Sequence, residues 1–275
     1  MGSFEILQLI ITGLYLLAAI LFFTGVFANR ERLRALSSWM AVVAFGLHTV
    51  DIGAVLFMHR GAALASGNFY FSLFAWSLIL IYFVVWWRLR SHFLGLTASP
   101  LALILFFSST AVQHLTVTMP KKLTVLFVGM HIGTLFLSMA LLAMAFGAGM
   151  AFMYLDRKIK AKEKLEGFRK EMPSLETFDK VNHWAIMAGF PLYTFGLVSG
   201  FIWGRQTWGK VFTWDPKEII AVFIWFAFAF LFHQRLIYGW KGRKPARLAI
   251  WVFLFTLVSM VGVNFLLPTH HSFKP

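Results

Sequence analysis

The residues most suited to chemistry lie in one short stretch, residues 203–218, which reads WGRQTWGKVFTWDPKE. Its large aromatic residues, four within twelve positions, are Trp203, Trp208, Phe212 and Trp214. Its interleaved cations are Arg205, Lys210 and Lys217. Flat apolar faces beside cations suit a flat apolar ligand that carries carboxylates. An interfacial aromatic belt is the alternative, but a belt spreads its aromatic residues over many helix ends.

Haem is a ligand of this kind, and its iron requires axial ligands. The chain has no cysteine, which excludes thiolate ligands, disulfides and cysteine nucleophiles and leaves histidine as the best candidate. His131 is expected near one end of its helix, and His270 and His271 follow the last apolar run, all on the side of the Trp-rich stretch. A single histidine is more often a surface or hydrogen-bonded residue, and their joint placement favours ligation. We therefore expect His131 and one of the adjacent pair, His271 or His270, to hold one non-covalent haem b.

A second haem site is expected inside the membrane, between His48 and His233. Polar side chains are costly there, so neither histidine is expected to stand without a partner. A direct hydrogen bond between the two histidines is the alternative to a haem between them. Asp51 lies three residues after His48, on the same helical face. It is expected to orient a ligand imidazole or to meet a haem propionate, or else to pair with a buried histidine or arginine.

These residues must be positioned by membrane-spanning helices. Only 13% of the 275 residues are charged and 59% are apolar, whereas a soluble domain carries roughly 25% charged residues. This composition excludes an ordinary soluble enzyme and a disordered chain. Eight apolar runs have about the length that spans a bilayer: 4–28, 38–58, 69–87, 99–117, 124–154, 181–203, 218–238 and 248–267. The expected fold is an all-α integral membrane bundle, one domain over residues 1–275, with a helix starting at the Asp215-Pro216 pair.

Lys and Arg residues predict the orientation of these spans, because cytoplasmic loops retain positive charge. Of the 25 cations, 18 fall in alternate loops: 29–37, 88–98, 155–180 and 235–247. We therefore expect these four loops in the cytoplasm, with both termini and residues 203–218 on the outer side of the cytoplasmic (inner) membrane. Residues 155–180 are expected to form a solvated charged helix and loop. The net charge of +14 then reflects topology and the lipid bilayer, and no nucleic-acid partner is expected.

The sequence resembles the CcsA-type cytochrome c assembly family, which includes the HemX-like proteins. That family carries a Trp-rich loop of the form WGxxWxWDPKE, the WWD motif, and this chain has WGKVFTWDPKE at 208–218. The similarity extends to GFPLYTFGLVSGFIWG at 189–204, FLFHQR at 230–235 and GVNFLLPTHHSF at 262–273. Upstream, LHTVDI at 47–52 and FVGMHIGTLFLSMALL at 127–142 are similar to the family's other His-bearing helices.

The resemblance implies that His131 and His271 are the external haem ligands, and that His233 and His48 are the intramembrane ones. It also implies that haem crosses the membrane and is then held under the Trp-rich loop. A CcsB-type subunit would be the partner, and the cysteines of an apocytochrome CxxCH motif would add to the haem vinyl groups. The chain would then be a component of a cytochrome c haem lyase.

Three positions depart from the family's usual pattern: Val211, Phe212 and Ile219. Phe212 stands where the motif commonly has Trp, and this weakens the ligase signature. The departures leave open a HemX-like regulator, which binds haem as a signal and affects the level of glutamyl-tRNA reductase. A haem-bearing electron-transfer subunit is a third hypothesis, which lacks an explanation for the Trp-rich loop.

Overall fold

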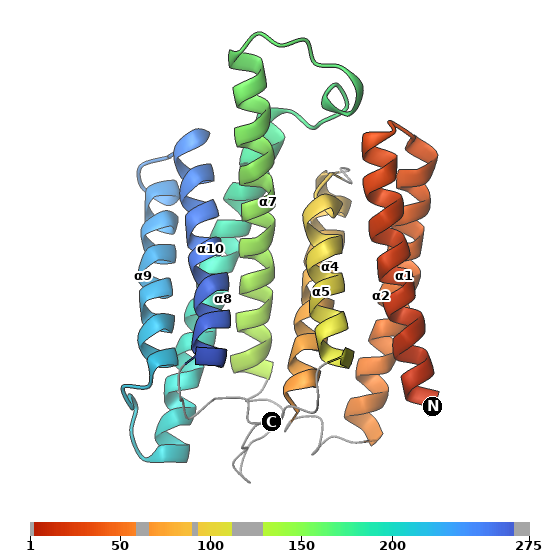
Figure 1. Ribbon diagram of the computed structural model, residues 1–275. Helices are drawn as coiled ribbons and strands as arrows, with labels where there is room; N and C mark the ends of the chain where they lie inside the picture. The colour runs from red at the N-terminus through yellow and green to blue at the C-terminus, as the bar shows by residue number, and fades with distance from the viewer. Residues whose placement is uncertain (1–2, 59–65, 90–92, 112–128, 267–275) are drawn as a thin grey trace. The chain divides into compact units, whose positions relative to one another are not determined.

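The computed structural model describes residues 3–58, 66–89, 93–111 and 129–266, and these residues are built from helices (Figure 1). Eight α-helices lie within them: α1 (Ser3–Phe27), α2 (Glu31–Met58), α4 (Gly67–Leu89), α5 (Gly95–Ala111), α7 (Thr134–Lys160), α8 (Leu175–Trp208), α9 (Pro216–Leu236) and α10 (Arg243–Leu266). A π-helical turn, η1 (Gly129–Gly133), leads into α7, and a short 3₁₀ turn, η2 (Gly167–Arg169), precedes α8. The predicted all-α membrane bundle is confirmed.

Six of these segments are long and apolar enough to cross a membrane. They are α1, α2, α4, the continuous η1–α7 segment, α8 and α9. A helix keeps all its backbone hydrogen bonds internal, which is what the lipid interior requires. The chain is therefore a multi-pass membrane protein. Helices α5 and α10 coincide with the two remaining predicted spans, and their passage through the membrane stays a prediction.

Several helices extend beyond the predicted apolar runs, so parts of the predicted loops are helical. Helix α2 begins at Glu31 instead of residue 38, and α8 runs from Leu175 to Trp208 instead of 181–203. Hydropathy detects only the apolar part of a helix, whereas the backbone stays helical until a residue stops it. Left-handed residues follow the ends of three of these helices: Asn29 (φ 53°), Lys162 (φ 54°) and Gly209 (φ 73°).

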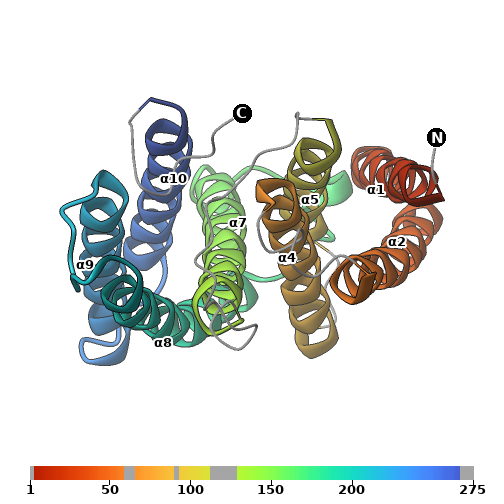
Figure 2. The ribbon, with the colours of Figure 1, turned by 90° about the horizontal axis from the view of Figure 1, so that it is seen from below.

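The chain divides into two compact units. Unit 1 comprises Met1–His114 and Tyr154–Thr177, and thus holds α1, α2, α4 and α5. Unit 2 comprises Leu115–Met153 and Phe178–Pro275, and thus holds most of α7 and α8, with α9 and α10. Figure 2 shows the four helices of each unit end-on. The prediction of one domain over the whole chain is not tested by this division.

The side chain of His48 connects the helices of unit 1. Its side chain is fully buried, with Nδ1 3.0 Å from the Tyr15 hydroxyl of α1 and Nε2 2.8 Å from the Ser72 hydroxyl of α4. The ring also meets Phe106 of α5 edge-on, with centroids 4.5 Å apart. One imidazole therefore contacts all three other helices of its unit, and both of its nitrogens are hydrogen-bonded, as a buried polar group requires.

The charged segment between α7 and α8 packs on the α1–α2 turn of unit 1. Arg34 pairs with Glu171, and the Phe27 and Phe168 rings meet edge-on at 5.8 Å. Another ion pair joins the last turn of α7 to this segment. Lys158 donates to both Glu163 oxygens and holds the pKa of the Glu163 carboxyl below its ordinary value. Its cations are thus largely balanced by its own carboxylates.

The helices of unit 2 are joined by polar and aromatic contacts. Ser138 of α7 donates to the Gly189 carbonyl of α8 at 2.7 Å. Trp225 of α9 donates to Thr194 of α8 at 3.0 Å. The rings of Phe146 in α7 and Phe253 in α10 stack at 4.6 Å. Hydrogen bonds between helices hold these packed positions where lipid offers no competing partner.

A buried ion pair joins the ends of α8 and α9. The Arg235 guanidinium donates to both Asp179 oxygens, at 3.0 and 3.2 Å, and to Asn182 Oδ1 at 2.6 Å. Asp179 Oδ1 also accepts the Gly242 amide at 2.8 Å, and Arg235 donates to the Trp240 carbonyl at 3.1 Å. The pair thereby fixes the α9–α10 turn as well as the helices.

Replacing Asp179 by Ala should destabilise unit 2 strongly, because it leaves the Arg235 charge buried without its partner. The expected loss is about 3–5 kcal/mol, seen as a lower thermal midpoint of the purified chain in detergent. The double variant Asp179→Leu/Arg235→Met should recover much of the lost stability, because no buried charge is left without a partner. Glu163→Ala, which removes an exposed pair, serves as the control and should leave the midpoint unchanged. Equal midpoints for Asp179→Ala and Glu163→Ala would contradict the role given to Arg235.

Candidate haem-binding site

His131 lies in the π-helical turn η1 at the start of the long α7 segment, as expected near a helix end. Its Nδ1 is 2.7 Å from the carbonyl oxygen of Gly196 in α8. A carbonyl can only accept a hydrogen bond, so Nδ1 must carry the proton. In the neutral imidazole, Nε2 then holds the lone pair. Metal-binding histidines are commonly held in this way, with one nitrogen donating to a carbonyl and the other free to ligate.

Glycines of α8 make this contact possible. Gly196 and Gly200 form a GxxxG pattern, which lets helices approach closely. A Cβ atom at Gly200 would lie 2.5 Å from the His131 ring, and one at Gly196 would lie 2.5 Å from Leu135. The imidazole therefore rests directly on the α8 backbone. Neither glycine was predicted from the sequence, although their small-residue spacing is a signal that the sequence carries.

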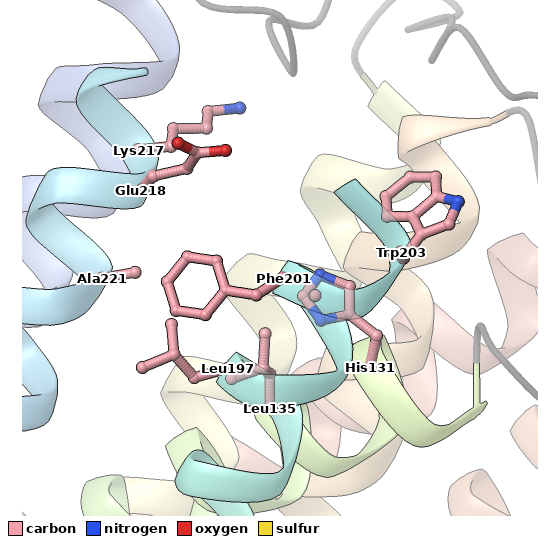
Figure 3. Close-up of a pocket in the computed structure, with 9 residues that line it drawn as sticks. His131, Leu135, Leu197, Phe201, Trp203, Lys217, Glu218 and Ala221 are labelled. Atoms are coloured by element: carbon pink, nitrogen blue, oxygen red, sulfur yellow. The ribbon is translucent and has the colours of Figure 1, made fainter. Parts of the chain in front are cut away.

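A cavity of about 230 Å³ opens beside His131, and α7, α8 and α9 all contribute to its wall. Figure 3 shows Phe201 pointing toward Ala221 of α9, with His131 and Trp203 on the opposite side of the cavity from α9. The apolar side chains of the wall are Leu135, Leu197, Phe201, Trp203 and Ala221. Its charged residues, Lys217 and Glu218, both come from α9. The cavity thus combines flat apolar faces, an imidazole and a cation.

The Trp-rich stretch is divided between helix and loop. Trp203 and Arg205 belong to α8, and Trp208 is its last residue, so the loop itself is residues 209–215. The first part of the predicted loop 203–218 is therefore helical, because α8 continues to Trp208. The predicted helix start is confirmed: Asp215 caps α9 by accepting the Lys217 amide at 2.8 Å, and Pro216 is its first residue.

A row of rings connects the loop to the cavity. Phe201 lines the cavity, and its ring centroid lies 5.8 Å from that of Phe212. The rings of Phe212 and Trp214 meet edge-on, with centroids 5.0 Å apart. Glu218 anchors the loop by accepting the Thr213 amide at 2.7 Å. Trp214 has a left-handed backbone (φ 62°) and is 76% exposed. A bulky residue in this conformation is held there by its surroundings, and such strain tends to occur at functional sites.

The three cations proposed for haem carboxylates differ in position. Arg205 and Lys210 are exposed, whereas Lys217 is half-buried and lines the cavity. The structure thus brings Lys217, Trp203 and His131 together. His270 and His271 lie outside the described residues, so the second axial ligand on the outer face stays a prediction.

The intramembrane pair of histidines also stays a prediction. His48 belongs to unit 1, where both ring nitrogens are hydrogen-bonded, so an iron ligand would have to replace Tyr15 or Ser72. His233 belongs to unit 2 and is exposed, with its ring edge-on to Tyr238 at 5.4 Å. Asp51 is buried and hydrogen-bonds to Gln8, and within the described residues its Oδ1 has no partner.

The helices and this cavity define a multi-pass membrane protein with a histidine and a row of aromatic residues at one end of a helix bundle. A sequence profile described as "Cytochrome C assembly protein" matches residues 66–271. The chain belongs to this family, which assigns it to cytochrome c biogenesis.

Relatives that carry the name "Cytochrome c biogenesis protein CcsA" cover much of the chain. The protein of Chlorella vulgaris is 31% identical over 240 residues, which is 75% of this chain and 76% of the relative. That of Guillardia theta is 31% identical over 231 residues, 75% of each chain. That of Gloeobacter violaceus is 42% identical over 98 residues, 36% of this chain and 29% of the relative. The predicted membership of the CcsA-type family is confirmed.

Gly200→Ala should displace His131, because the new methyl group would meet the imidazole. We expect haem affinity, measured by titration of the Soret absorbance, to fall about tenfold, corresponding to overpacking by about 1–3 kcal/mol. Gly189→Ala overpacks α8 at another point, chiefly against Phe228 of α9 and away from His131, and serves as the control. It should lower stability and leave haem affinity unchanged. Wild-type haem affinity in the Gly200→Ala variant would exclude the proposed position of the imidazole against Gly200.

Proposed function

We propose that this chain binds haem at the outer end of unit 2 and holds it for attachment to an apocytochrome c. The observation that carries the proposal is the hydrogen bond from His131 Nδ1 to the Gly196 carbonyl. It fixes the tautomer whose Nε2 can bind iron, in a residue that lines an apolar cavity. Family membership supports the same pathway.

The residues present fit haem in chemistry and in shape. An imidazole is the commonest axial ligand, and the aromatic and aliphatic walls match a flat macrocycle. The cavity volume of about 230 Å³ is below the roughly 300–1,000 Å³ usual for small-molecule pockets. The described residues therefore supply one face of the site. We propose that His271, or its neighbour His270, supplies the second axial ligand.

Residues of the cavity and of the adjoining loop have distinct tasks in this proposal. His131 holds the iron from one side, while Phe201 and Trp203 exclude water and stack on the ring. Lys217 meets a propionate by a charge-assisted hydrogen bond, with Arg205 and Lys210 at the exposed edge. Asp215 and Glu218 keep the loop in place, and exposed Trp214 offers a surface to the incoming apocytochrome. The bound haem supplies the vinyl groups to which the CxxCH thiols add.

The partner in this proposal is a CcsB-type subunit, which helps to present the apocytochrome, and the pair forms the haem lyase. The chain is proposed to lie in the cytoplasmic membrane, with residues 203–218 and both termini on the outer side. His48 and His233 are proposed to form the intramembrane site through which haem reaches the outer one. His48 would then exchange one of its two hydrogen bonds for iron.

Replacing His131 by Ala should remove outer-site haem, because it deletes both the iron ligand and the hydrogen bond that orients it. The purified full chain should bind haem at least tenfold more weakly, with a shifted Soret band. His183→Ala, which changes a histidine of α8 that does not line the cavity, should keep the wild-type spectrum. A His131→Ala variant with wild-type affinity and spectrum would eliminate this function.

Replacing His233 by Ala separates a haem conduit from a regulator. If the intramembrane site loads first, this variant should lose haem at both sites, whereas His131→Ala should empty only the outer one. Haem content and cytochrome c maturation are measured together in cells, and added imidazole should partly rescue the His233 variant. Wild-type maturation in His233→Ala cells would exclude a conduit and favour the HemX-like regulator.

A further inference from the structure

The turn between α9 and α10, residues 237–242, carries a group of exposed cations with the first residues of α10. They are Lys241, Lys244 and Arg247, and no ion pair joins any of them to a carboxylate within the described residues. Asp179, the acidic residue bound to this turn, is engaged by Arg235 and the Gly242 amide. The end of α7 and the segment that follows it differ, because Lys158, Lys160 and Lys164 each pair with a carboxylate.

The same turn presents exposed apolar and aromatic side chains. Leu236, Ile237 and Tyr238 are each more than half exposed. The Lys244 ammonium lies over the Trp240 ring, 5.4 Å from its centroid, as in a cation–π pair. Aromatic rings with cations beside them are typical of the boundary between lipid tails and headgroups.

The turn is also fixed in shape. Arg235, which is buried, donates to the Trp240 carbonyl, and Asp179 accepts the Gly242 amide. Gly239 and Gly242 supply left-handed conformations (φ 62° and 74°) that the turn requires. The cations are therefore carried by a preorganised loop. Helix α10, with 24 residues, begins at Arg243. The positive end of its helix dipole adds to the positive potential of these cations.

We propose that this surface, the α9–α10 basic turn, binds the headgroup of an anionic phospholipid. Lys241, Lys244 and Arg247 surround the phosphate, while Ile237, Tyr238 and Trp240 contact the upper acyl chains. The surface directly follows the end of the membrane-spanning helix α9, which places it where headgroups lie. This site is separate from the haem cavity, which lies at the opposite end of α9, and it does not depend on the proposed function.

Native mass spectrometry of the full chain in detergent tests the proposal. The chain is equilibrated with equal amounts of phosphatidylglycerol and phosphatidylcholine that have the same acyl chains. Wild-type protein should retain at least tenfold more phosphatidylglycerol. Each cation removed should weaken retention about fivefold, so the variant Lys241→Gln/Lys244→Gln/Arg247→Gln should lose the preference.

The matched control is Lys158→Gln/Lys160→Gln/Lys164→Gln, which removes the same charge from paired positions and should keep the preference. Lys241→Arg/Lys244→Arg should also keep it, which separates lost charge from altered folding. Inorganic phosphate at equal ionic strength should not displace the lipid. An equal loss in both triple-Gln variants, no loss in either, or displacement by inorganic phosphate would overturn the proposal.

Discussion

The hydrogen bond between His131 Nδ1 and the Gly196 carbonyl is the interaction on which the candidate site depends. It assigns the proton of the imidazole and leaves Nε2 as the available ligand. It forms because Gly196 and Gly200 have no side chain, so that the imidazole can approach the backbone of α8. The π-helical turn places His131 at the start of the α7 segment. Turns of this kind often occur at functional sites. The chemistry of the site therefore begins in the packing of two helices.

Each unit is also tied by one buried polar residue. In unit 1, His48 joins α2 to α1 and α4 through its two nitrogens. In unit 2, Arg235 joins α9 to α8 and to the turn before α10. Inside lipid, helix association gains no hydrophobic driving force, so such hydrogen bonds and close small-residue contacts specify the packing. Fixing α9 in this way also fixes its first turn, which contributes Lys217 and Glu218 to the cavity.

Much of the fold could be predicted from the sequence, because the apolar runs and the need for internal hydrogen bonds leave few alternatives. The start of α9 was predicted from Asp215 and Pro216, whose capping chemistry is local. The far end of α8 was not, because Arg205, Gln206 and Thr207 are polar and yet helical. Hydropathy measures transfer to lipid, whereas helix length is decided by stop residues such as Gly209.

The candidate site was predictable in its residue types more than in its contacts. The aromatic cluster and His131 were found from the sequence, and the structure brings Trp203 of that cluster and His131 to one cavity, together with Phe201, which was missed. The role of the Gly196 carbonyl could not be found, because any residue has a carbonyl and only the packing of α7 on α8 selects this one. The contacts of His48 were missed for the same reason, since Tyr15 and Ser72 are distant in sequence.

The most direct test of the account is the electron paramagnetic resonance spectrum of ferric haem bound to the purified chain. Two imidazole ligands give a low-spin signal. The account predicts that His131→Gly converts one haem from low spin to high spin, and that free imidazole restores the low-spin signal by occupying the vacated position beside Gly196. A low-spin signal of full intensity in His131→Gly, without added imidazole, would contradict it.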